Sequence, residues 1–190
     1  MSGFLIVLIV LIGIPLLLVI WVVGMYNGLV GLRNRYKNAF AQIDVQLKRR
    51  YDLVPNLVET VKGYKIYEKD VLTRIVKLRV EAGQESHPEA RGKIEGDLAQ
   101  NIGRLFALAE NYPDLKASKV YLDLQEKLTE VEDHLQYARR YYNGTVRNLN
   151  IYVQSFPSNL VAAIFGFKRA EYFQLDAPEE GLAPDVKLAS

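Results

Sequence analysis

The two histidines have the widest chemical repertoire in this 190-residue chain, which contains no cysteine. His87 lies in a polar stretch beside Pro88, and His134 lies within a long helical pattern. Neither follows a glutamate by three residues, because Gln84 and Val131 occupy those positions, so the Glu-x-x-His pair of di-iron helical bundles is missing. The chain also lacks the nucleophile-elbow, phosphate-loop and dinucleotide fingerprints. We therefore expect no metal, no cofactor and no enzymatic activity.

One cluster of polar side chains combines both charges within 16 residues. Acidic and basic residues spaced three or four apart share a helix face and attract one another. The cluster has two interpretations: it contacts a partner protein at the end of a helical bundle far from the membrane, or its ion pairs and caps fix a turn, which is the commoner outcome. The candidates for partner binding are Asp44, Lys48, Arg49, Arg50, Asn56 and Glu59. Arg139 and Arg140 beside Tyr141 and Tyr142 similarly favour stacking within the bundle.

A run of 22 uncharged residues, positions 4–25, predicts the element that anchors the chain. Such a helix is about 33 Å long, enough for a hydrocarbon core of about 30 Å. Residues 1–3 carry no side-chain cation, which disfavours a cleaved signal peptide and leaves a short non-cytoplasmic tip. Arg33, Arg35 and Lys37 precede the first acid, so the bulk of the chain is expected in the cytoplasm.

The end of the apolar run carries two further membrane signals. Trp21 and Tyr26 suit the headgroup level, where amphipathic rings are enriched. Gly24 and Gly28 fit the small-xxx-small pattern of close helix packing in a membrane, or they give the chain a flexible exit.

Charge is unevenly distributed along the chain. Residues 33–79 carry 12 basic and 5 acidic side chains, whereas residues 170–190 carry 1 and 5. A cationic stretch next to a bilayer is attracted to anionic headgroups. Most of the charged residues beyond Arg50, however, are expected to lie away from the membrane, where they form a solvated helix surface. We expect no nucleic-acid partner.

Hydrophobic periodicity predicts four long helices, and no segment alternates with period two. The first continues the span to Tyr51; the second has Asp52 as N-cap, with Pro55 in its first turn, and ends near Gly83. The alternative is one kinked helix passing through Pro55. The third spans about 89–110, and the fourth extends from an N-cap at Ser118 to Pro157. The fourth helix has a heptad stripe: Tyr121, Leu124, Leu128, Val131, Leu135, Ala138, Tyr142, Thr145, Leu149, Tyr152 and Phe156.

The expected fold is therefore all-α, an N-terminal transmembrane helix continuing into an antiparallel bundle of four long helices over residues 26–175. Helices joined by short loops alternate in direction, so the fourth returns to the membrane. The apolar run 160–167 then either lies in the headgroup layer or caps the bundle core. Residues 176–190 read as a loose acidic tail. The candidates for lipid contact are Trp21, Tyr26, Arg33, Arg35, Lys37, Ile164, Phe165, Phe167, Lys168 and Arg169.

Several blocks of the sequence have a recognisable pattern. The longest is the block 38–64, and the shorter ones are Tyr26-Asn27-Gly28-Leu29-Val30, Leu32-Arg33-Asn34, Tyr112-Pro113-Asp114-Leu115-Lys116-Ala117, Ala138-Arg139-Arg140-Tyr141-Tyr142-Asn143, Phe156-Pro157 and Gly166-Phe167. Together they resemble the LemA family of bacterial membrane proteins. The resemblance implies one N-terminal anchor in the bacterial inner membrane, a cytoplasmic helical domain and no established catalytic activity. Relatives are associated with membrane-bound metalloproteases and with internal membrane compartments.

The residues and the resemblance together favour a non-enzymatic, membrane-anchored scaffold that self-associates as a homo-oligomer and presents a protein-binding surface. The alternatives are an adaptor or regulator of a membrane-bound metalloprotease, and a lipid-shaping protein. The partners expected are the lipid bilayer, a second copy of the chain, and a membrane protease or other membrane protein.

Overall fold

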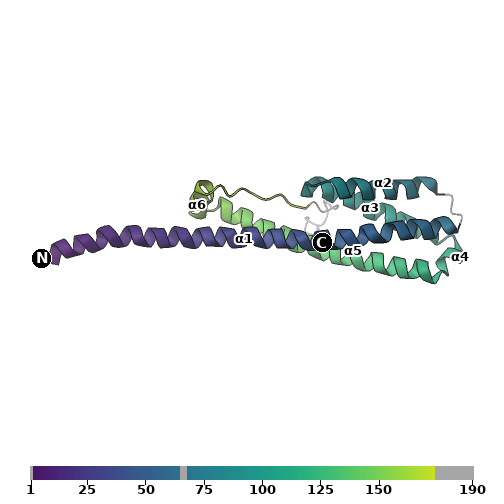
Figure 1. Ribbon diagram of the computed structural model, residues 1–190, viewed down its shortest axis with the longest axis horizontal. Coiled ribbons are helices and arrows are strands. Elements are labelled where there is room, and N and C mark those ends of the chain that lie inside the picture. Colours follow the sequence, from purple (N-terminus) through teal and green to yellow (C-terminus); the bar gives the residue numbers. More distant parts are fainter. Residues whose placement is uncertain (1, 65–67, 174–190) are drawn as a thin grey trace, which may run out of the picture. The chain divides into compact units, whose positions relative to one another are not determined.

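The computed structural model describes residues 2–64 and 68–173, and within these ranges it contains only helices and no strand. The helices are α1 (Ser2–Gly63), α2 (Lys69–Gln84), α3 (Pro88–Ala109), α4 (Pro113–Lys116), α5 (Lys119–Gln154) and α6 (Ser158–Ile164) (Figure 1). The predicted all-α class is confirmed. The predicted acidic tail, residues 176–190, lies outside the described residues.

The helix boundary predicted at Asp52 is wrong, because α1 continues through Pro55 to Gly63. A proline inside a helix has no N–H to donate to the carbonyl four residues earlier. Here that carbonyl belongs to Tyr51, and it accepts a hydrogen bond from Nε of Arg79 on α2, at 2.8 Å. A side chain from another helix thus replaces the lost backbone donor. The alternative of one helix passing through Pro55 is the correct one.

The chain divides into two compact units. Residues 1–39 and 142–170 form the first, called here the span unit, and residues 40–141 and 171–190 form the second, called the central unit. Both α1 and α5 contribute to each unit.

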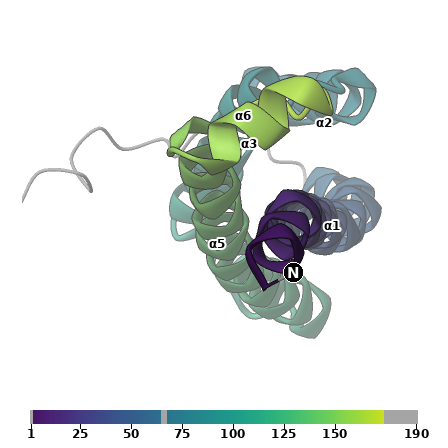
Figure 2. The ribbon, with the colours of Figure 1, turned by 90° about the vertical axis from the view of Figure 1, so that its left-hand side faces the viewer.

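The central unit is a bundle in which successive long helices run in opposite directions, as predicted (Figures 1 and 2). Its segments of α1, α2, α3 and α5 lie side by side, and the single turn α4 leads from α3 into α5. Apolar side chains spaced three and four apart on each helix form the core. The buried members are Val54, Leu57, Val58, Val61, Val71, Leu72, Ile75, Leu78, Leu98, Ile102, Leu105, Ala109, Leu115, Tyr121, Leu124 and Leu128.

The heptad stripe predicted for the fourth helix matches the buried face of α5. Every predicted stripe position from Tyr121 to Leu149 is buried. The hydroxyl of Ser118 accepts a hydrogen bond from the N–H of Tyr121, at 3.4 Å, as expected of an N-cap. Phe156, the last predicted position, lies beyond the end of α5 and is 80% exposed.

The span unit contains the one helix among the described residues that is long and apolar enough to cross a membrane, namely α1. Most of the apolar side chains that the structure describes between Phe4 and Val23 are exposed, as a lipid-facing helix requires. The other end of the unit has a small core of its own. Leu29 on α1 packs there with Leu149, Val161, Ala162 and Phe167.

Candidate functional site

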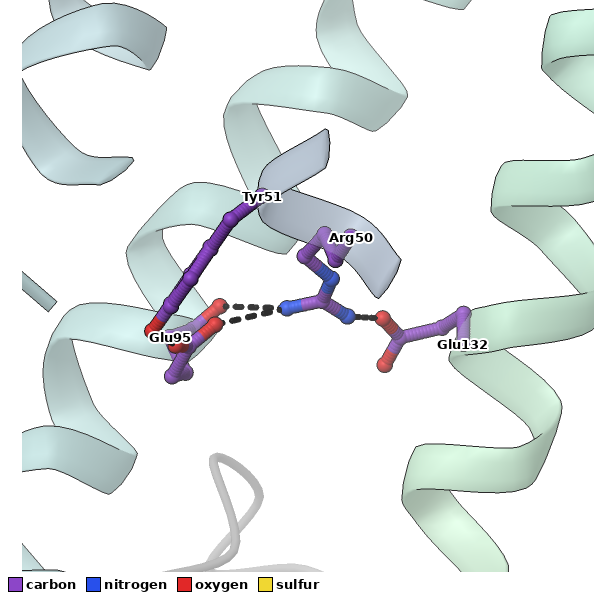
Figure 3. Close-up of polar contacts among 4 residues, drawn as sticks. All are labelled: Arg50, Tyr51, Glu95 and Glu132. Atoms are coloured by element: carbon purple, nitrogen blue, oxygen red, sulfur yellow. Dashed lines mark hydrogen bonds and ion pairs between the residues drawn. The ribbon is translucent and has the colours of Figure 1, made fainter. Parts of the chain in front are cut away.

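Arg50 does not belong to an exposed partner-binding surface, which corrects the prediction from the sequence. Its side chain is 2% exposed and lies between α3 and α5 (Figure 3). Nη1 of Arg50 donates to Oε2 of Glu95 at 2.9 Å, and Nη2 pairs with the carboxylate of Glu132. The hydroxyl of Tyr51 donates to the other carboxylate oxygen of Glu95. Arginine has several donors in a rigid fork, so it can join two carboxylates from different helices.

Burial shifts the pKa values of Arg50 and Tyr51. It lowers the pKa of Arg50, and the adjacent Glu95 carboxylate opposes that shift. It raises the pKa of Tyr51, and the negative charge of Glu95 raises it further. The phenol therefore remains protonated and continues to donate. These four residues form a polar core that joins α1, α3 and α5 through the contacts of Arg50 with Glu95 and Glu132 and of Tyr51 with Glu95.

Asp44 also forms a contact within the bundle. Its Oδ1 lies 2.6 Å from Nη1 of Arg91 on α3. Lys48, Arg49, Asn56 and Glu59 are exposed, but they lie along α1 rather than at a turn. The predicted turn at residues 44–59 is therefore wrong. These four exposed residues form a polar surface on α1.

The histidines are far apart in the sequence and each has a glutamate beside it. The Nδ1 atom of His87 lies 3.1 Å from Oε1 of Glu85, and Nε2 of His134 lies 3.5 Å from Oε1 of Glu130. Within residues 2–64 and 68–173, no group of three His, Asp or Glu side chains is placed to hold a metal ion.

Arg139 stacks inside the central unit, as the sequence suggested, but on a different ring. Its guanidinium carbon lies 5.2 Å from the centroid of Phe173, whose side chain is fully buried. The contact joins α5 to the segment that follows α6 in the chain. The sequence did not identify Phe173 as the stacking partner of Arg139, because Phe173 lies outside any helical pattern.

The apolar segment 160–167 is divided between a buried and an exposed face. Val161, Ala162 and Phe167 are buried, so Phe167 is a core residue rather than a lipid contact. Ile164 is 76% and Phe165 is 51% exposed. The buried residues cap the core of the span unit, and lipid contact stays a prediction for Ile164 and Phe165. Leu160, the first residue of this run, and Phe156, which was not predicted to contact lipid, are also exposed.

Gly166 is the reason for this division. It has φ of +70°, a left-handed conformation that glycine adopts without strain. The N–H of Phe167 donates to the carbonyl of Ala162 at 2.9 Å, which closes the helix as in a Schellman motif. The chain reverses at this point, so Phe165 stays outside and Phe167 returns to the core.

Tyr26 fixes this segment beside the end of the apolar part of α1. Its ring centroid lies 4.8 Å from that of Phe165 and 5.8 Å from that of Phe167. The guanidinium carbon of Arg33 lies 5.0 Å from the Phe167 centroid. The exposed apolar face of α6 is thus located where the predicted span ends, with Trp21, 45% exposed, about one turn and a half earlier on α1.

The span unit has no acidic residue. Among residues 1–39 and 142–170 there are six basic side chains and no Asp or Glu, whereas the rest of the chain carries 18 basic and 22 acidic residues. All six are exposed: Arg33, Arg35, Lys37, Arg147, Lys168 and Arg169. Five of them are predicted lipid contacts. The sequence alone did not reveal the full asymmetry, because the two halves of the unit are about 100 residues apart.

Gly28 packs against its own chain. A β-carbon at this position would lie 3.2 Å from the hydroxyl oxygen of Tyr152 on α5, so the small residue permits a close contact within the span unit. Gly24 has no such neighbour among the described residues. The structure therefore gives Gly28 a role within one chain, and a helix–helix contact at Gly24 stays a prediction.

Asn150 is a buried polar residue that the sequence analysis missed. Its Nδ2 donates to the carbonyl of Ala170 at 2.9 Å, and its Oδ1 accepts from the N–H of Ala170 at 2.8 Å. The amide thereby holds the backbone that follows Arg169 against α5. No specific signal in the sequence indicated it, because Asn143 and Asn148 lie in the same helical pattern.

The chain is similar in sequence to proteins of one family. The LemA family model matches residues 39–188. Magnetosome protein MamQ 2 of Paramagnetospirillum magneticum is 29% identical, with 78% of this chain and 64% of the relative covered. Protein LemA of Metamycoplasma hominis is 29% identical, with 83% and 76% covered. Magnetosome protein MamQ of Magnetospirillum gryphiswaldense is 26% identical, with 78% and 64% covered.

The chain thus spans somewhat less than two thirds of the length of the magnetosome relatives. The long apolar helix at the N-terminus of the described residues fits a membrane-associated protein. Because the family model covers most of the chain, the chain belongs to the LemA family.

Proposed function

We propose that this protein is a non-enzymatic scaffold of the bacterial inner membrane, which self-associates and presents the surface of its helical bundle to other membrane proteins. Its central unit lies in the cytoplasm and the N-terminus of α1 on the opposite side.

The observation that carries the proposal is the composition of the span unit. Exposed apolar side chains on α6 and six cations occur there without any acidic residue. This combination suits the interface of an anionic bilayer, where apolar groups enter the acyl boundary and cations face the headgroups. The protein would then contact the bilayer at two places, through the apolar part of α1 and through α6. The same features support orientation with the cationic side in the cytoplasm.

The exposed face of α6 also favours a second candidate function, in which the protein shapes lipid. A shallow apolar insertion beside a span displaces headgroups on one side of the bilayer. The names of the relatives fit this function, a scaffold and an adaptor of a membrane-bound metalloprotease equally well.

Photo-crosslinking of the full chain in its native membrane tests these functions against one another. Benzoylphenylalanine replaces Lys48 in one variant and Leu160 in another, both exposed residues. The scaffold predicts protein adducts from position 48, including a second copy of the chain, and lipid adducts from position 160.

Arg104 on α3, also exposed, provides the control position. If position 48 gives no more protein adducts than position 104, the scaffold surface is wrong. Lipid adducts from position 160 together with that result support the lipid-shaping function.

A further inference from the structure

We infer that a groove between α1 and α5 in the central unit is the contact surface for a second copy of the chain, packed with its helices parallel to those of the first. The groove has a volume of about 270 Å³ and is lined by Gln42, Val45, Gln46, His134, Tyr137 and Ala138. This inference rests on the self-association in the proposed function and specifies the surface that performs it.

The groove presents apolar surface that the bundle does not use. Val45 is 53%, Tyr137 is 68% and Tyr141 is 48% exposed. Tyr141 lies four residues after Tyr137 and so extends the same face of α5 by one turn. Tyrosine offers a large rigid contact area and is enriched at the energetic centres of interfaces.

The groove also contains an unused acceptor. Oε1 of Gln46 is buried and has no hydrogen-bond partner within the described part of the chain. A buried acceptor without a donor costs free energy, typically about 1–3 kcal/mol. The phenol of Tyr137 from a second copy is a donor of suitable length, and its own side chain is largely exposed.

Charges flank the groove in complementary positions. Arg49 follows Val45 by four residues on α1, and Glu130 precedes His134 by four on α5, so both continue the groove-lining faces. Arg49 is exposed and forms no ion pair within the described residues. Glu130 is exposed and lies beside His134.

The contact between Arg50 on α1 and Glu132 on α5 shows which positions of the two helices lie at the same level along the bundle axis. Arg49 is one residue from Arg50, and Glu130 is two residues from Glu132, so the two flanking charges lie within about 5 Å of one level along the bundle. Both copies are anchored through the same end of α1, which gives them the same polarity in the membrane. A two-fold axis parallel to the helices then places α1 of each copy against α5 of the other, with Arg49 facing Glu130 twice.

Disulfide trapping between two differently tagged copies in the membrane tests the surface. The natural chain has no cysteine, so only the introduced thiols react. Val45→Cys in one copy and Tyr137→Cys in the other should give a linked dimer. The control replaces Val45→Cys by Val76→Cys on α2, an equally apolar residue that is 42% exposed, and should give none.

Charge exchange tests the pairing itself. Arg49→Glu added to both copies of the Val45→Cys and Tyr137→Cys pair should lower the yield of linked dimer at least about fivefold, because both symmetric contacts become repulsive. Combining Arg49→Glu with Glu130→Arg in each chain should restore it. Unchanged thermal unfolding of Arg49→Glu, followed by circular dichroism, shows that the fold is kept.

The inference is overturned if the control pair links as efficiently, if Arg49→Glu keeps the full yield, or if the double exchange fails to restore it. The mass of the unlinked full chain in lipid nanodiscs separates the two claims. An oligomer without linkage between positions 45 and 137 refutes this surface alone, whereas a monomer refutes the proposed self-association as well.

Discussion

Replacement of Arg50 by alanine is expected to lower the free energy of unfolding by about 3–5 kcal/mol, since removing one partner of a buried ion pair leaves an uncompensated charge. Among the described residues, Arg50 is the cation that forms an ion pair with Glu95, and the Glu95 side chain is fully buried. Chemical denaturation of the full chain in detergent, followed by circular dichroism at 222 nm, measures the loss.

The matched control for this substitution is Lys48→Ala, which removes an exposed cation two residues away on the same helix and should change stability by less than about 0.5 kcal/mol. A second variant, Arg50→Met with Glu95→Gln, removes both charges and should recover much of the loss. Equal effects of Arg50→Ala and Lys48→Ala would show that the polar core does not hold the bundle together.

Replacement of Phe167 by alanine should release the segment 158–167 from the span unit. Phe167 is 9% exposed and packs edge-on against Tyr26, with Arg33 over its ring. Truncation of a buried phenylalanine costs about 3–5 kcal/mol. Hydrogen–deuterium exchange of the backbone amides of residues 158–167 measures the change, and their protection should fall by at least about a hundredfold.

Phe165→Ala provides a matched control one position beyond α6. Phe165 is 51% exposed, and the same truncation should lower protection by less than about tenfold. The two variants test whether Phe167, rather than Phe165, holds the segment against the core. If both release α6 equally, Gly166 does not divide the segment as described.

The fold was largely predictable from the sequence because long helices repeat their signal many times. The stripe on α5 has a residue every three or four positions from Tyr121 onward, so a single exception does not hide it. The boundary predicted at Asp52 was wrong because the cost of Pro55 inside a helix depends on whether another helix supplies a donor. Arg79 lies 24 residues after Pro55, and only the folded bundle brings it to the Tyr51 carbonyl.

The candidate site was less predictable because charge pairs depend on tertiary contacts. Arg49 and Arg50 are adjacent and look equivalent in the sequence, yet one is exposed and the other is enclosed by Glu95 and Glu132. In the same way, Phe165 and Phe167 differ only through the left-handed turn at Gly166. A helical period can assign faces, but it cannot predict which neighbouring helix supplies a carboxylate.

The combination of cations and exposed apolar residues in the span unit has a further consequence for the membrane. Basic side chains close to an anionic surface contribute about 1 kcal/mol each, so the contact of α6 should depend on lipid charge. In vesicles that contain phosphatidylglycerol, α6 is expected to lie deeper than in vesicles of phosphatidylcholine alone. The span itself requires no lipid charge, because its insertion is driven by apolar burial.

The depth of Ile164 in the bilayer tests the central claim most directly. An environment-sensitive nitrobenzoxadiazole label on Ile164→Cys in the reconstituted full chain should be quenched strongly by lipids with a nitroxide near the headgroup and weakly by aqueous iodide. The control label on Leu122→Cys, an exposed apolar position in the first turn of α5, should show the reverse. The account is contradicted if iodide quenches the label at position 164 as readily as the label at position 122.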